Sequence, residues 1–146
     1  MNVVLLLLFL MNSFSIDNAN EFADKMAPYY GYNLRYEMHD IGTWYAATVY
    51  NGKCTSQVYL SPQFYGVLGE DDLWKGVLAH EWAHVGQETC ANNERNADVT
   101  ALNKLLEAGE LSAYFRYMSF LKERWGWTDI DVNNVIEERN EKRILN

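Results

Sequence analysis

Residues 73–85, with the sequence LWKGVLAHEWAHV, constrain the fold of this chain more than any other stretch. At helical spacing they present two apolar stripes, one that contains Leu73 and Val77 and one that contains Trp74 and Trp82. A helix that is apolar on most of its circumference is expected to be buried in the middle of a domain. We therefore predict a central helix that other elements cover on several sides.

The same stretch contains His80-Glu81-Trp82-Ala83-His84, an H-E-x-x-H motif. Residues four apart lie on one face of a helix, so His80 and His84 can reach the same zinc ion at about 2.0–2.1 Å. Glu81 lies beside them, where its carboxylate can hold and deprotonate a metal-bound water. The chain has three histidines, and two of them are in this motif. The motif predicts a Zn²⁺ site with His80 and His84 as ligands and Glu81 as the catalytic base.

A catalytic zinc usually takes three protein ligands and leaves one position for water. The remaining histidine, His39, lies upstream in a predicted turn and is a poor candidate for the third ligand. A carboxylate on the following helix is favoured instead. Glu94 and Asp98 are four apart and share a helical face, so Glu94 can bind the metal while Asp98 accepts a hydrogen bond from the far nitrogen of His80.

Cys90 is a competing third ligand because it lies six residues after His84. The metzincin pattern places its last histidine at that distance. That pattern also requires a glycine at position 87, which is Gln87 here. A Cys90 thiolate ligand would exclude a disulfide between Cys54 and Cys90.

With Glu94-Arg95-Asn96-Ala97-Asp98 as the second element, the chain resembles the gluzincin metallopeptidases over about residues 33–108. Only nine residues separate His84 from Glu94, so the resemblance implies a minimal zincin-like domain. It also implies that a peptide substrate adds as a strand beside the sheet. The oxyanion-stabilising residue of such enzymes has no certain counterpart. The candidates by position are Tyr114, Arg116 and Tyr117.

The rest of the pattern predicts one α+β domain over residues 16–146, with a small antiparallel sheet packed on the central helix. Asn51-Gly52 is a strong signal for a type I′ hairpin turn. In the helix at 110–124, Leu111 and Phe115 are among the residues expected to face inward. The predicted elements are helices at 18–30, 94–108, 110–124 and 128–143, and strands at 34–38, 44–50 and 54–60.

Residues 1–15 are predicted to be a signal peptide or a short N-terminal anchor. The apolar run at 3–11 is too short to span a bilayer, which needs about 20 residues, and Ser13 and Ser15 are small residues suited to a cleavage site. An exported chain can oxidise its two cysteines, Cys54 and Cys90, although two buried thiols are the alternative. The expected location is secreted or periplasmic.

We therefore expect an exported zinc metallopeptidase that hydrolyses peptide bonds in a peptide or protein substrate. Two alternatives stay open: a non-catalytic, zinc-stabilised binding domain whose site is closed by a fourth ligand, and an amide hydrolase that acts on peptidoglycan. The formal charge of −8 argues against nucleic-acid binding, which needs a basic surface. No stable membrane span is expected, and the pattern leaves the oligomeric state open.

Overall fold

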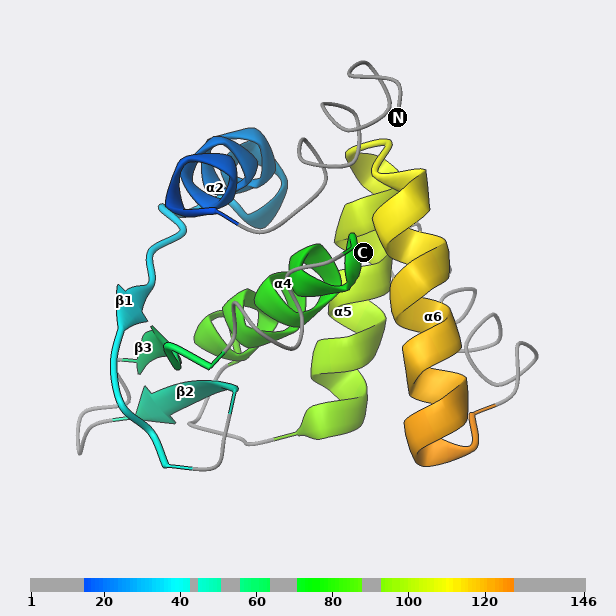
Figure 1. The fold of residues 1–146 in the computed structure, drawn as a ribbon. Coiled ribbons are helices and arrows are strands. Elements are labelled where there is room, and N and C mark those ends of the chain that lie inside the picture. Colours follow the sequence, from blue (N-terminus) through cyan, green and yellow to red (C-terminus); the bar gives the residue numbers. More distant parts are fainter. Residues whose placement is uncertain (1–14, 43–44, 51–55, 64–70, 88–92, 128–146) are drawn as a thin grey trace, which may run out of the picture.

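The computed structural model describes residues 15–42, 45–50, 56–63, 71–87 and 93–127. In this part of the chain the predicted α+β class is confirmed, with four helices and a three-stranded sheet (Figure 1). The elements in chain order are α2 Ile16–Tyr30, β1 Glu37–Met38, β2 Ala46–Tyr50, β3 Ser56–Leu60, α4 Leu73–Val85, α5 Glu94–Glu107 and α6 Leu111–Trp125.

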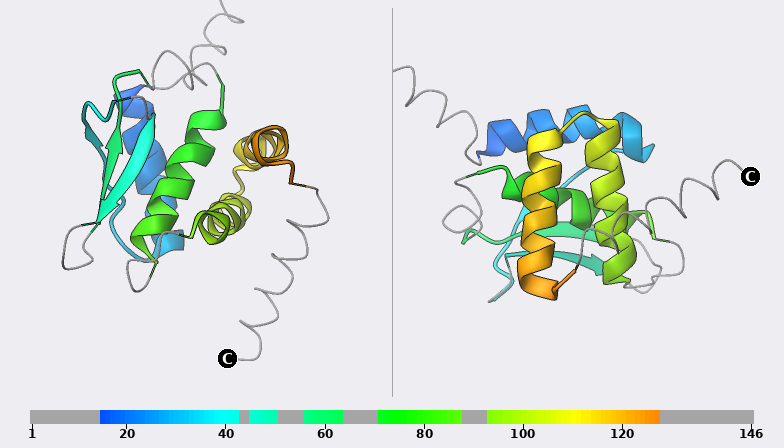
Figure 2. Two further views of the ribbon diagram at one scale, coloured as in Figure 1. Left: turned by 90° about the horizontal axis from the view of Figure 1, so that it is seen from below. Right: turned by 90° about the vertical axis from the view of Figure 1, so that its right-hand side faces the viewer.

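Helix α4 is the buried central helix that its two apolar stripes predict. The sheet lies on one side of it, α5 and α6 lie on the other, and α2 crosses above (Figures 1 and 2). Trp74, Leu78 and Trp82 are at most 1% exposed, and Phe22 of α2 meets the Trp74 ring edge-on at 5.4 Å. Full burial of a large apolar side chain contributes about 1.5–3 kcal/mol, so these contacts hold α4 firmly among its neighbours.

Local signals decide where the helices begin and end. Asn93 caps α5, because its side chain accepts a hydrogen bond from the backbone N–H of Asn96 at 3.0 Å. Asp71 accepts from the N–H of Leu73 at 2.8 Å at the start of α4. Gly31 and Gly126 end α2 and α6 in the left-handed conformation, with φ of 80° and 65°, which glycine adopts without steric cost. The end of α2 and the start of α5 agree with the predicted ones, and α6 ends one residue beyond its predicted end.

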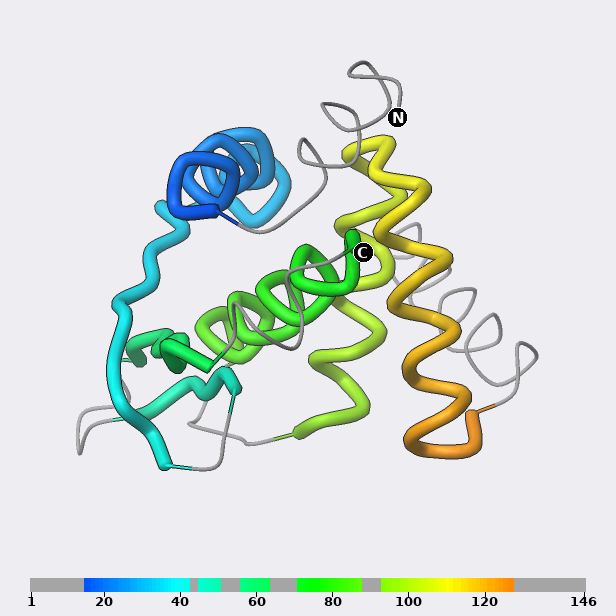
Figure 3. The backbone as a smooth tube through the Cα atoms, in the orientation of Figure 1, coloured from blue at the N-terminus to red at the C-terminus, as the bar shows by residue number. Residues whose placement is uncertain are grey.

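The sheet differs from the predicted antiparallel one. Strands β2 and β3 pair antiparallel as expected, but β1 pairs with β3 in parallel, so the sheet is mixed and has the order β1-β3-β2. In Figure 3 the chain descends from α2 through β1, and β1 runs in the same direction as β3 and opposite to β2. In the sheet that the described residues form, β2 is one of the two edge strands.

The β2–β3 register also differs from that of an uninterrupted two-residue hairpin. It pairs Tyr50 with Ser56, whereas a two-residue turn at Asn51-Gly52 would place Tyr50 opposite Lys53. The turn itself lies outside the described residues.

Helix α6 contacts the core along a narrower stripe than predicted. Tyr114, Tyr117 and Leu121 are buried against α4 and α5, but Leu111 and Phe115 are 52% and 62% exposed. The prediction that these two residues face inward is wrong, because they lie on the adjoining stripe of the helix, away from α4 and α5. An amphipathic pattern predicts that a helix packs, but not how wide its contact is.

Several predictions fall outside the described residues. They are the N-terminal segment 1–14, a Cys54–Cys90 disulfide and the final helix at 128–143. Within the described ranges, no helix combines the length and the apolar character needed to cross a membrane.

Candidate metal centre

The structure brings together the side chains of His80, His84 and Glu94, from α4 and the first turn of α5. The Nε2 atoms of the two histidines lie 3.0 Å apart. Glu94 Oε2 is 3.0 Å from His80 Nε2, and its Oε1 is 3.4 Å from His84 Nε2. Both histidines are buried, whereas the Glu94 side chain is 58% exposed. The cluster is therefore enclosed on the α4 side and open on the Glu94 side.

A buried hydrogen-bond chain orients His80. Its Nδ1 lies 2.6 Å from Asp98 Oδ1, the contact that the four-residue spacing of Glu94 and Asp98 predicted. Tyr117 Oη donates to the same oxygen at 2.6 Å. Because a carboxylate accepts, the Nδ1 of His80 carries the proton and its Nε2 lone pair in the neutral tautomer is directed at Glu94 and His84.

A second polar contact, which the sequence did not reveal, orients His84. Its Nδ1 lies 2.9 Å from Gln87 Oε1, and Gln87 Nε2 donates to the backbone carbonyl of Asn93 at 2.8 Å. Since the amide oxygen can only accept, Nδ1 of His84 donates and its Nε2 lone pair is left for the cluster. The neighbouring Asn93 caps α5, so Gln87 links the end of α4 to the start of the helix that carries Glu94.

The charges around the cluster favour a cation at its centre. Burial lowers the pKa of His80, but hydrogen bonds to Asp98 and Glu94 and the charges of Glu81 and Asp98 together raise the pKa to about 10. The hydrogen bond to His80 lowers the pKa of Glu94, against the opposing effect of burial. Burial and the charge of Asp98 raise the pKa of Tyr117 well above 10, which keeps its hydroxyl protonated as a donor. Carboxylates thus surround the imidazoles and stabilise positive charge between them.

The donor set fits zinc. Two atoms that bind one zinc ion at about 2.05 Å in tetrahedral geometry lie about 3.3 Å apart. The three separations in the cluster are 3.0, 3.0 and 3.4 Å. Two imidazole nitrogens and one carboxylate oxygen are also a ligand set that leaves a fourth position for water.

Glu81 lies next to the cluster but is held by the sheet. Its Oε2 accepts a hydrogen bond from Thr48 Oγ1 of β2 at 2.6 Å, and the same hydroxyl lies 2.9 Å from the Glu81 carbonyl. Tyr50, also in β2, donates to the carbonyl of His84 at 2.6 Å. These bonds hold β2 against the motif, and within the described residues they leave one carboxylate oxygen of Glu81 for other partners.

A cleft lies over the cluster, between β2 and the C-terminal end of α6. Two adjoining cavities of about 260 and 420 Å³ make it up, and both are lined by Ala46, Glu81, Glu94, Arg124 and Trp125. The larger cavity follows residues 46–48 along the free edge of β2.

The remaining candidate residues do not all reach this cleft. Arg116 pairs with Asp71 at 2.7 Å, and His39 is exposed beside Tyr59 at a ring distance of 4.9 Å. Tyr114 is buried, and Tyr117 faces the cleft but donates to Asp98. Cys90 lies outside the described residues. The sequence offered no signal for Arg124, because only the packing of α6 brings it to the site.

Gly76 allows α6 to approach the site closely. A Cβ at position 76 would lie 2.5 Å from both Cβ and Cγ of Tyr117, a distance that side chains do not tolerate. We expect Gly76→Ala to destabilise the fold by about 1–3 kcal/mol through overpacking, although Ala is the better helix former. Urea denaturation measures the change. In a Tyr117→Gly background, which removes both the Cβ and the ring of residue 117, the penalty should vanish, and a penalty that persists there would refute the contact as its cause.

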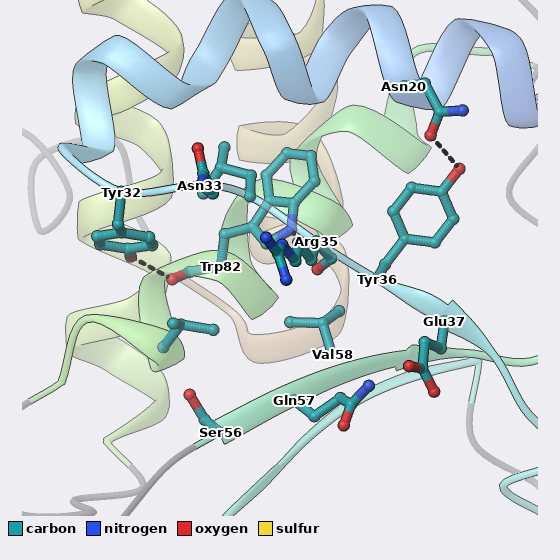
Figure 4. A pocket seen from close by; sticks show the side chains of 12 residues that line it. Asn20, Tyr32, Asn33, Arg35, Tyr36, Glu37, Ser56, Gln57, Val58 and Trp82 are labelled. Carbon is teal, nitrogen blue, oxygen red and sulfur yellow. Dashed lines mark hydrogen bonds between the residues drawn. The ribbon is translucent and has the colours of Figure 1, made fainter.

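A separate cavity, of about 520 Å³, lies on the other side of α4 (Figure 4). It is lined by Trp82, which is two residues from His80 and so on the opposite helical face. Tyr32 donates to the carbonyl of Trp82 at 2.6 Å, and the Trp82 indole donates to the carbonyl of Arg35 at 3.1 Å. These two bonds fix Trp82, and with it the motif, on the face of α4 opposite His80. The described residues that line this cavity include no histidine or cysteine, so of the two sites only the cleft adjoins the candidate metal cluster.

The chain matches no protein-family model, no curated protein and no solved structure. What the site can do therefore follows from its own geometry.

Proposed function

We propose that this chain is a zinc-dependent peptidase of the gluzincin type with a minimal zincin-like fold. One observation carries the proposal: His80, His84 and Glu94 converge to within ligand spacing, and Glu81 lies directly beside them at the floor of a cleft. The histidine tautomers that Asp98 and Gln87 favour support it, because both leave Nε2 for the metal. The apolar run at 3–11 supports export to the outside of the cell or to the periplasm.

In this proposal each residue has a defined task. Zinc, when bound, lowers the pKa of a water molecule toward 7 and supplies Lewis acidity. Glu81 accepts the proton of the attacking water and then transfers it to the leaving amine. Thr48 holds one Glu81 oxygen at 2.6 Å, which leaves the other to exchange the proton.

The edge of β2 supports a peptide as the substrate. In the described sheet β3 occupies one side of β2, and the cleft follows the other side along residues 46–48. An extended peptide can add to such an edge by backbone hydrogen bonds. It would then run past Glu81, so its scissile carbonyl would lie near the metal.

The test combines metal content with hydrolysis. The full chain is purified, its zinc is measured by mass spectrometry, and a mixed peptide library is incubated with it before and after chelation. We expect about one zinc per chain, cleavage that chelation stops, and recovery when zinc is restored. A protein without zinc affinity would refute the proposal. Zinc without cleavage would indicate the non-catalytic, zinc-stabilised domain.

We expect Tyr117→Phe to weaken zinc binding up to about tenfold while the fold is kept. The ring still packs against α4, but Asp98 loses the hydroxyl that holds it at 2.6 Å and fixes His80 less well. Competition with a zinc-binding dye measures the affinity. Tyr36→Phe is the matched control, because its hydroxyl bonds Asn20 away from the site (Figure 4). Equal zinc affinity in the two variants would mean that Tyr117 has no positioning role.

A further inference from the structure

Of the described residues that line the two cavities of the cleft, Arg124 is the one lysine or arginine. It lies in the last turn of α6, across the cleft from β2. Its guanidinium carbon is 5.8 Å from the centre of the Phe120 ring and 5.5 Å from that of the Trp125 ring. Aromatic faces attract a cation and restrict its motion, so the charge of Arg124 is directed rather than freely mobile.

No carboxylate in the described part of the chain pairs with Arg124. By contrast Arg116, the other arginine of α6, is paired with Asp71 at 2.7 Å. The carboxylates of the cleft have other partners: Glu81 accepts from Thr48, and Glu94 lies against the two histidines. Among the described residues, Arg124 is thus a cation at the cleft without a carboxylate partner, and its hydrogen-bond donors can serve a ligand.

The surroundings of Arg124 favour an anionic group on that ligand. The smaller cavity has an apolar wall, formed by Tyr45, Ala46, Val77, Phe120 and Trp125. A hydrogen bond between charged groups is stronger where water is partly excluded. A guanidinium binds a carboxylate through two parallel hydrogen bonds. Since the protein carries a net charge of −8, an anionic substrate needs such a local cation to enter the cleft.

Resting on the proposed peptidase function, we propose that Arg124 binds a carboxylate of the substrate close to the cleaved bond. The preferred substrates are then peptides with an acidic side chain, or a free terminal carboxylate, within a residue or two of that bond. The apolar wall accommodates the rest of the residue that carries the carboxylate.

The test begins with cleavage sites mapped in the mixed peptide library by the zinc-loaded wild-type protein. Matched peptides are then made for one site: Glu against Gln at the flanking positions, and a free against an amidated C-terminus. We expect kcat/KM to be at least about tenfold higher for one carboxylate-bearing member. The Glu and Gln peptides test for recognition of a side-chain carboxylate, and the free and amidated peptides test for recognition of a terminal carboxylate.

The variants assign the preference to Arg124. Arg124→Gln should remove the preference ratio, Arg124→Lys should keep part of it, and Arg116→Gln should leave it as in the wild type. Glu81→Gln protein with zinc gives a second readout, since its affinity for the same peptides should show the preference without hydrolysis. A ratio unchanged by Arg124→Gln, or an equal loss of kcat on both members, would overturn the proposal and leave the peptidase function standing. If the zinc-loaded wild type cleaves no peptide, both fall.

Discussion

Glu81→Gln is expected to abolish peptide hydrolysis and to leave zinc bound. The amide has nearly the same shape as the carboxylate but cannot accept a proton from water, so the general base is lost. A positioned general base contributes a factor of about 10²–10⁴ to the rate, so kcat should fall by at least about 10²-fold. Thr48 can still donate to the remaining side-chain oxygen, as it does to Glu81 at 2.6 Å, so the fold should be kept. Single-turnover hydrolysis and zinc content measure the two effects.

Glu123→Gln is the matched control, because it makes the same chemical change on the exposed surface of α6. It should hydrolyse peptides like the wild type. Full activity in the Glu81→Gln protein would mean that another group is the base. Loss of zinc in that protein would instead indicate that Glu81 takes part in metal binding.

Glu94→Ala is expected to lower zinc affinity by more than the roughly 10–100-fold that loss of an outer hydrogen-bond partner costs. Its two oxygens are 3.0 and 3.4 Å from the Nε2 atoms of His80 and His84, so the substitution removes the only carboxylate of the three-residue group. Hydrolysis should be lost with the metal. Zinc titration measures the affinity. Zinc should also raise the melting temperature of the wild type much more than that of the variant. A ligand that binds the folded state stabilises it in proportion to its affinity, and the affinity of the variant is lower.

Glu107→Gln, near the other end of α5, controls for the loss of one acid from this helix. It should bind zinc like the wild type. If Glu94→Ala bound zinc with wild-type affinity, the third ligand would have to be another residue. Cys90 would then be tested by Cys90→Ser.

Much of the helical framework was predictable, because helix ends depend on residues close in sequence. Asn93 caps α5 and Gly126 ends α6 for reasons that act within a few residues. The burial of α4 also followed from the sequence. A helix with apolar residues on most sides would expose some of them to water in any surface position, which costs free energy.

The sheet was predicted less well. The hairpin partners β2 and β3 are neighbours in sequence, and their antiparallel pairing was expected. The parallel pairing of β1 with β3 depends on the path of the chain between β1 and β2, which no periodicity records. The same limit applies to α6, where the pattern did not reveal that Leu111 and Phe115 lie outside the packed stripe.

By itself the sequence determined that His80 and His84 share one face of a buried helix with Glu81 beside them, because a spacing of four residues is one helical turn. It determined that Asp98 lies one turn from Glu94 for the same reason. Only the tertiary structure decided that Glu94 meets the two imidazoles, that Tyr117 reaches Asp98, and that Thr48 and Arg124 face the cleft. These contacts join residues from separate elements. They depend on how α5, α6 and β2 pack around α4, and side-chain packing over long sequence separations leaves no spacing that can be read along the chain.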